Sequence, residues 1–296
     1  MIRPQQDWRR LYPQSAANVW DTGNFKMNYL DQGTGPVILC VHGNPTWSFY
    51  YREIVKKFSD QYRVIAVDHV GCGLSSKPSR NEFDYTLATH RDNLVGLIDH
   101  LNLQNITLVA HDWGGAIGLA AAVQRIERLS SMMLMNTAAF PPPYMPKRIG
   151  ILRTPILGTA AIRGLNAFAR PAVTMATARH RLAPDVASGL LFPYQSWGDR
   201  VAIDAFVRDI PMSSSHPTHP VLVQLERDLV KLKHLPVQLI WGMKDWCFRP
   251  ECLERFLHHW PDANVARLDD VGHYVLEDAP DETLSILRSF LQSHRP

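Results

Sequence analysis

The segment that most constrains the fold is residues 110–115, which reads Ala-His-Asp-Trp-Gly-Gly. It directly follows an apolar run at 106–109 and precedes residues 116–123, which favour a helix. A strand that turns sharply into a helix, with small residues around the turn, pushes one side chain out at the end of the sheet. That outward residue is usually a nucleophilic serine, and here it is Asp112.

An aspartate at this turn indicates a different reaction from a serine. A serine that attacked an sp3 carbon would become an ether, which water does not readily cleave. An aspartate becomes an ester, whose carbonyl carbon water can attack. The turn therefore indicates displacement at an sp3 carbon rather than acyl transfer. The structural alternative is that Asp112 only caps the helix that follows it.

Strand and helix patterns alternate along most of the chain, which predicts an α/β fold with a mostly parallel central sheet flanked by helices. The predicted strands are 25–30, 36–41, 62–67, 106–109, 132–135, 236–241 and 265–268. The predicted helices are 47–58, 86–101, 116–123, 251–259 and 282–291.

The alternation stops after Asn136, at a proline-rich exit from the sheet. Residues 137–235 have no clear strand pattern and many prolines, so they are predicted to form an inserted helical cap. Residues 1–136 and 236–296 would then be the two parts of the core.

Candidate catalytic residues follow the predicted strands, where sites form in open α/β sheets. Asp245 follows the strand 236–241, and His273 follows the strand 265–268. Asp112, Asp245 and His273 occur in the order nucleophile, acid, histidine of an α/β-hydrolase triad. Asp245 would orient His273, and His273 would deprotonate the water that attacks the ester on Asp112.

Other residues near these positions leave alternatives open. Asp269, Asp270 and Glu277 are nearby carboxylates that could replace Asp245 as the acid. His42 and His111 are expected to be structural, and so is the glycine-rich segment 68–75. The backbone N–H groups of Asn44 and Trp113 are expected to form the oxyanion hole.

From about residue 25 to 291 the chain resembles the haloalkane dehalogenases of the α/β-hydrolase fold. The resemblance rests on the segments 42–47 (His-Gly-Asn-Pro-Thr-Trp), 111–114, 241–245 and 272–273. It implies that the side-chain N–H groups of Asn44 and Trp113 bind the departing halide. One branch of that family places the acid after the strand before the cap, where this chain has Asn136, which leaves Asp245.

The resemblance extends to the third dehalogenase subfamily, which merges with the β-lactone decarboxylases of long-chain olefin biosynthesis. Residues 136–141, 163–168 and 272–278 resemble both groups. In the decarboxylases the lactone carboxylate takes the place of the halide. We expect hydrolysis of haloalkanes through an alkyl-enzyme ester, with decarboxylation of a dialkyl β-lactone as the alternative.

Two further functions compete with these. An epoxide hydrolase also uses an aspartate elbow but needs cap tyrosines as donors, for which Tyr144 and Tyr194 are candidates; Asn44 favours an anion site instead. A non-enzymatic scaffold would more often have lost a triad member. No cofactor or metal is expected. Each of the cap aromatics is more typical of a core residue than of a substrate wall, but together they suggest an apolar pocket between cap and core: Phe168, Phe192, Tyr194, Trp197 and Phe206.

The N-terminal residues, the apolar runs and the charge pattern suggest where in the cell the protein is located. The first residues lack the apolar stretch of a signal peptide, and no apolar run is long enough to span a bilayer, so a cytoplasmic protein with reduced cysteines is expected. Residues 137–184 contain no Asp or Glu but seven cations: Lys147, Arg148, Arg153, Arg163, Arg170, Arg179 and Arg181.

This basic segment is either a solvated surface or a contact for anionic lipid or an acidic protein. Nucleic-acid binding is not expected, because no nucleic-acid motif accompanies the charge. A homo-oligomer remains open.

Overall fold

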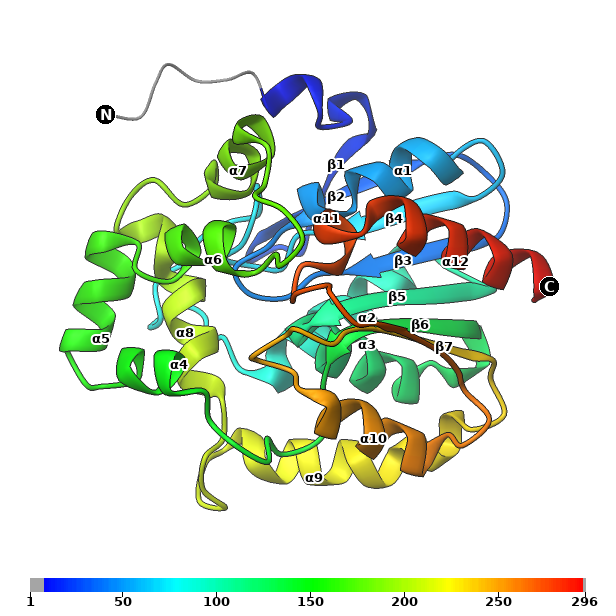
Figure 1. Ribbon diagram of the computed structural model, residues 1–296. Helices are drawn as coiled ribbons and strands as arrows, with labels where there is room; N and C mark the ends of the chain where they lie inside the picture. The colour runs from blue at the N-terminus through cyan, green and yellow to red at the C-terminus, as the bar shows by residue number, and fades with distance from the viewer. Residues whose placement is uncertain (1–7, 295–296) are drawn as a thin grey trace.

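The computed structural model describes residues 8–294, and within them an eight-stranded sheet runs through the molecule (Figure 1). Its order is β1-β2-β4-β3-β5-β6-β7-β8. Strand β2 is antiparallel to both β1 and β4, and the other neighbours are parallel. The strands are β1 (Ala17–Asp21), β2 (Lys26–Gln32), β3 (Val37–Val41), β4 (Arg63–Val67), β5 (Ile106–Asp112), β6 (Leu129–Thr137), β7 (Val237–Gly242) and β8 (Asn264–Leu268).

Helices cover both faces of this sheet (Figure 1). One face carries α2 (Leu87–His100), α3 (Trp113–Gln124), α9 (Thr218–Asp228) and α10 (Pro250–His259); the other carries α1 (Arg52–Phe58), α11 (Val275–Asp278) and α12 (Pro280–Ser293). Short 3₁₀ turns cover Trp8–Arg10, Gln14–Ala16, Ser48–Tyr51, Ile126–Arg128, Gly198–Arg200 and Leu229–Leu232. None of the helices in the described chain is long and apolar enough to cross a membrane.

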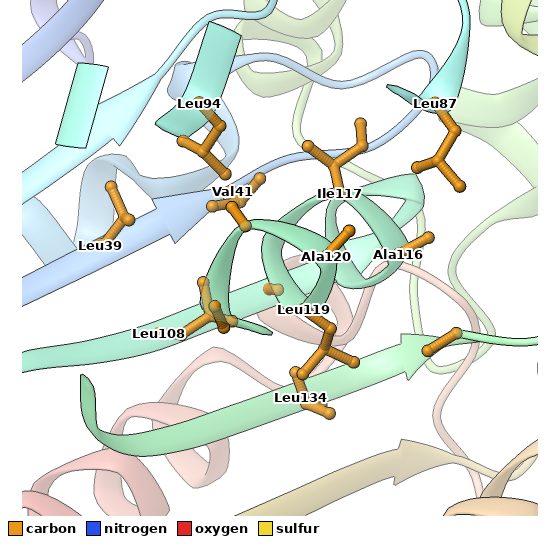
Figure 2. Packing of buried hydrophobic residues seen from close by; sticks show 14 of the residues in the cluster. Leu39, Val41, Leu87, Leu94, Leu108, Ala116, Ile117, Leu119, Ala120 and Leu134 are labelled. Atoms are coloured by element: carbon orange, nitrogen blue, oxygen red, sulfur yellow. The ribbon is translucent and has the colours of Figure 1, made fainter. Parts of the chain in front are cut away.

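Helix α3 packs closely on the centre of the sheet because its sheet-facing residues are small or aliphatic. Figure 2 shows Leu119 of α3 beside Leu134 of β6, whereas Ile117 points from the other side of α3 toward Leu87 of α2. Strands β3 and β5 are buried along their whole length, as expected for central parallel strands covered on both faces. This packing fixes the carboxyl end of β5 relative to its neighbours.

The predicted parallel α/β sheet is confirmed, with all seven predicted strands present. Strand β1 was not expected from the pattern, because its residues are largely exposed on both faces. Strand β5 extends to Asp112, and the predicted helix 47–58 begins as a 3₁₀ turn before α1.

Between β6 and β7 the described chain contains no strand. Helices α4 (Lys147–Leu152), α5 (Leu157–Thr159), α6 (Ala169–Met175), α7 (Pro184–Leu191) and α8 (Val201–Asp209), with a π turn at Ala160–Gly164, lie together at one end of the sheet (Figure 1). We refer to α4–α8 as the inserted helices. The predicted cap also includes α9, but Leu222 and Leu225 of α9 belong to the core cluster that α2 and α3 form. By its packing, α9 therefore lies with the core.

Candidate active site

Asp112 occupies a sharp turn that only its neighbours' small size allows. It is the last residue of β5 and has a φ of +53°, in a region that non-glycine residues rarely adopt. A Cβ atom on Gly114 would collide with the Val41 carbonyl oxygen, and one on Gly115 would collide with the Thr137 side chain. The hydroxyl of Thr137 donates to the carbonyl oxygen of Asp112. The turn is thus held from both sides.

The two oxygens of the Asp112 carboxylate have different surroundings. Oδ1 accepts the backbone N–H of Asn44 at 2.6 Å, and the N–H of Trp113 also bonds the carboxylate. Oδ2 faces His273, 3.7 Å from Nε2. Burial raises the pKa of Asp112 to about 6, although the charge of His273 and the two backbone donors partly offset that rise.

His273 lies between two carboxylates. Its Nδ1 is 2.8 Å from Oδ2 of Asp245, on the side opposite Asp112. Burial lowers the pKa of His273, but the charge of Asp245, its hydrogen bond and the charge of Asp112 together hold that pKa above its ordinary value. The ring of Phe248 stacks on the imidazole, with 5.6 Å between centroids.

Asp245 is itself fixed by hydrogen bonds. Its Oδ1 accepts the backbone N–H of Cys247 at 2.6 Å, and its Oδ2 accepts from Nδ2 of Asn136 at 2.9 Å. The Asn136 side chain also bonds the backbone N–H and carbonyl of Gly242. Asn136 therefore links the ends of β6 and β7 and holds the carboxylate that contacts His273, a contact that the sequence did not reveal.

The alternative carboxylates lie elsewhere. Glu277 makes two hydrogen bonds to the buried guanidinium of Arg52. Asp270 is exposed and pairs with Arg179, and Asp269 is exposed as well. Of the four carboxylates considered as the acid, Asp245 is the one that contacts His273.

The other histidines of the strand ends are buried and hold loops. Nε2 of His111 lies 2.9 Å from the backbone carbonyl oxygen of His273. Nε2 of His42 accepts the backbone N–H of His69 at 3.1 Å. Burial lowers the pKa of both His42 and His111 well below the ordinary value. These contacts are structural, as the sequence suggested.

The loop that carries His273 packs directly on the inserted helices. The carboxylate of Asp278 accepts the backbone N–H of Gly272, at 2.7 Å, and also those of Ala178 and Arg179 beyond α6. The N–H of Tyr274 donates to the carbonyl oxygen of Ala176 at 2.8 Å. A Cβ atom on Gly272 would lie 2.6 Å from that same oxygen. The loop that carries His273 and the turn after α6 are therefore in close contact through several backbone hydrogen bonds.

A cavity of about 470 Å³ opens above Asp112, between the carboxyl ends of the strands and the inserted helices. Asp112, His273 and the side chains of Asn44 and Trp113 all line it. Most other lining residues are apolar, and among the described lining residues Arg148 is the one lysine or arginine. The volume lies in the range of small-molecule sites.

Asn44 and Trp113 border the cavity with different freedom. Nδ2 of Asn44 lies 3.3 Å from the carbonyl oxygen of Ile203, which leaves its second N–H for another acceptor. The ring of Trp113 packs beside Phe206, with 5.4 Å between centroids. Two backbone donors and two side chains with N–H groups thus surround Asp112.

One of the five cap aromatics lines the cavity, in agreement with the expectation that each is more typical of the core. Among the predicted cap aromatics, Phe168 lines the cavity, whereas Phe192 packs on Trp8, Phe206 backs Trp113, Trp197 is half exposed and Tyr194 is buried. The remaining aromatic lining residues come mainly from the strand-end loops: Trp113, Phe140, Tyr144, Trp246, Phe248 and Tyr274. Several directly follow the candidate catalytic residues in sequence, which is the signal that could have found them.

The two tyrosines considered for epoxide chemistry are already engaged. The Tyr144 hydroxyl donates to the Cys247 carbonyl oxygen at 2.6 Å and accepts the N–H of Arg249 at 2.8 Å. The Tyr194 hydroxyl donates to the carbonyl oxygen of Thr46. Neither arrangement favours donation to an epoxide. Among the described residues, no group of three or more His, Cys, Asp and Glu side chains gathers to hold a metal ion.

Comparison with known proteins places this geometry in context. The family described as "alpha/beta hydrolase fold" matches residues 36–280. The chain is 38% identical over 270 residues to a cis-3-alkyl-4-alkyloxetan-2-one decarboxylase of Shewanella oneidensis, covering 90% of this chain and 85% of that protein. It is 34% identical over 276 residues to haloalkane dehalogenase 2 of Mycobacterium bovis, covering 92% and 93%.

A solved structure with a similar fold is the haloalkane dehalogenase DatA from Agrobacterium tumefaciens C58. It superposes with a TM-score of 0.83 at 24% identity and covers 94% of this chain and 96% of that one. At that identity the match bears on the fold alone.

Proposed function

The chain belongs to the α/β-hydrolase fold family, together with haloalkane dehalogenases and oxetanone decarboxylases, and from this we propose that Asp112 is the nucleophile of an enzyme that attacks an sp3 carbon. One observation carries the proposal. Oδ1 of Asp112 is held by the Asn44 N–H, while Oδ2 faces His273, and Asp112 lines the cavity. The free oxygen attacks, and the held oxygen becomes the ester carbonyl.

We propose decarboxylation of a β-lactone with two alkyl substituents as the main reaction. The sequence alone favours dehalogenation narrowly. The large apolar cavity suits two alkyl chains better than a small haloalkane, and decarboxylases of two organisms are 38% and 37% identical to this chain. Both observations favour the β-lactone over a haloalkane as the substrate.

The atoms and charges of the decarboxylation balance without a water molecule. Oδ2 of Asp112 forms a bond to the ring carbon that bears the lactone oxygen, and that carbon–oxygen bond breaks to give a carboxylate. Asn44 and Trp113 donate to this carboxylate through their side chains. The bond to the carboxylate carbon then breaks, its electrons form the carbon–carbon double bond, and Asp112 leaves. The products are an alkene and carbon dioxide.

Dehalogenation is the second candidate, because the site contains what ester hydrolysis requires. Asp112 displaces halide towards Asn44 and Trp113, which leaves an alkyl ester. His273, held by Asp245, removes a proton from water. The resulting oxyanion on Oδ1 is stabilised by the backbone N–H groups of Asn44 and Trp113. The products are an alcohol, halide and a proton.

A side-by-side assay separates the two reactions. The protein is incubated with a cis-dialkyl β-lactone and, separately, with 1-bromobutane, and alkene, carbon dioxide, alcohol and bromide are measured. We expect rapid alkene release and slow bromide release. Rapid bromide release without alkene would establish dehalogenation instead, and neither product from either substrate would contradict both.

His273→Gln tests the different need for water. With a bromoalkane, the variant should accumulate an alkyl ester on Asp112, visible as an intact-mass increase. With the lactone it should keep part of its alkene release, because no water is activated. Loss of alkene release equal to the loss of alcohol formation would contradict the water-free route.

A further inference from the structure

The cavity opens to the surface beside a group of exposed apolar side chains. Ile151 of α4 lines the cavity and is 69% exposed, and Met175 of α6 lines it at 37% exposure. Past the end of α4, Ile156 and Leu157 are 82% and 74% exposed. Helices α4 and α5 pack against each other and lie side by side in Figure 1, so Ile151, Ile156 and Leu157 belong to neighbouring segments. We refer to Lys147, Arg148, Ile151, Ile156 and Leu157 as the mouth surface.

Ile156 is the most unusual residue of this surface. It is β-branched and has a φ of +61°, a conformation that costs energy for such a residue. Its side chain is nevertheless almost fully in water. Neither the strained backbone nor the exposed side chain of Ile156 stabilises the folded chain. We therefore infer that Ile156 contacts something outside this chain.

The charge beside these side chains indicates what that contact is. Among the seven cations of residues 137–184, three are engaged within the structure: Arg153 donates to backbone carbonyls of Val207 and Ile210, Arg163 to that of Trp197, and Arg179 pairs with Asp270 and Glu282. The other four, Lys147, Arg148, Arg170 and Arg181, pair with no described carboxylate, and of these Lys147 and Arg148 belong to α4, the helix that carries Ile151. Arg148 instead lies over the ring of Trp246, 5.4 Å from its centroid, at the cavity.

We propose that the mouth surface docks on an anionic lipid surface. Exposed apolar side chains that enter the interface, next to cations that meet anionic headgroups, are the combination that peripheral lipid-binding elements use. The cavity opens through this surface, so an apolar ligand could pass from lipid to Asp112 without crossing water. Lipid binding itself does not depend on which reaction the site performs; only this delivery route rests on the proposed function.

Vesicle co-sedimentation tests the proposal. The protein is mixed with vesicles of phosphatidylcholine alone and of equal parts phosphatidylcholine and phosphatidylglycerol. We expect binding to the anionic vesicles at least tenfold stronger than to neutral ones. The binding should fade when added salt shortens the Debye length from about 10 Å to about 3 Å. Equal binding to both vesicles, or none to either, would overturn the proposal.

Three variants locate the surface. Lys147→Ala should weaken anionic-vesicle binding about fivefold, as expected for one cation near the membrane. The double variant Ile156→Asp with Leu157→Asp should weaken it at least tenfold. Val19→Asp is the matched control, because Val19 is 59% exposed on the edge strand β1, outside the inserted helices. An equal loss in the control would overturn the placement.

Two readouts distinguish the alternatives. None of the three variants touches the cavity lining, so turnover of a short water-soluble substrate should stay within twofold of wild type. Light scattering without lipid should give the same mass for wild type and the double variant. If the wild-type mass instead falls from dimer to monomer in the double variant and vesicle binding is absent, the surface pairs two copies of this chain and the lipid proposal fails.

Discussion

The carboxyl edge of the sheet and the inserted helices above it are built in opposite ways. At the edge, Asp112, Asp245 and His273 are buried, and each is held by hydrogen bonds to neighbouring strands or loops. The inserted helices are short, from three residues in α5 to nine in α8, and expose several large apolar side chains. Under the proposed function, the edge would fix the geometry of the reaction and the insertion would shape access to it.

The largest test of this contrast is Asp112→Asn. It replaces the proposed nucleophile with a group of nearly the same shape, so turnover should fall on the order of 10⁴-fold or more. Thermal stability should change little, and burial without charge could even raise it. Asp270→Asn, at an exposed carboxylate of the sheet side, should keep full activity. Comparable loss in both would show that the edge is not organised around Asp112.

Arg52→Ala tests how much a buried ion pair near the carboxyl edge of the sheet stabilises the protein. Arg52 and Glu277 form a buried pair that joins α1 to α11, just after His273. Removing the guanidinium leaves a buried carboxylate without a partner, which should lower the free energy of unfolding by about 3–5 kcal/mol. Urea unfolding measures it. Lys57→Ala, which breaks the exposed pair with Asp281, should cost less than about 1 kcal/mol.

Asn44→Ala separates the side-chain donor from the backbone donor at the same residue. The backbone N–H that bonds Oδ1 of Asp112 remains, but the side-chain donor to the leaving group is lost. The rate should fall about 10²- to 10³-fold. Single-turnover kinetics should show the loss in the step that releases the anion. Full activity would remove the Asn44 side chain from the site.

The pH dependence sharpens the assignment of the two titrating groups. Asp112 must be ionised to attack, and its pKa of about 6 predicts that kcat/KM falls tenfold per pH unit below about pH 6. Alcohol formation also needs neutral His273, whose pKa is raised by Asp245 and Asp112, so that activity should keep rising to a higher pH than an ordinary histidine would require. Alkene release should lack this second rise. Identical profiles for both products would contradict the separate roles.

The smallest predicted effect lies in the inserted helices. Ile156→Gly relieves the strain of a positive φ, and after the entropy that glycine adds to the unfolded chain it should stabilise the protein by about 0.5 kcal/mol. Ile151→Gly, within α4, should instead destabilise it by about 0.5–1 kcal/mol. Differential scanning calorimetry compares the two. A loss of stability in both would mean that Ile156 packs in the folded protein.

The positions of the candidate catalytic residues at the carboxyl edge of the sheet could be predicted from the sequence because the signal for each is local. The elbow at Asp112 and the turns that carry Asp245 and His273 each directly follow an apolar strand. The contact of Asn136 with Asp245 joins residues far apart in the chain, and no short pattern encodes it. Strand β1 and the packing of α9 on the core were also not predicted. Neither of them changes the local pattern of apolar residues in the sequence.

The hydrogen bonds between Asp278 and the turn after α6 limit where the cavity can open. Lifting the insertion at that end would break the amide contacts of Asp278 and displace the loop that carries His273. We therefore expect any opening of the cavity at the opposite end, where exposed apolar side chains of α4 and α5 lie. Such an opening would admit a ligand without breaking the contacts that hold the His273 loop.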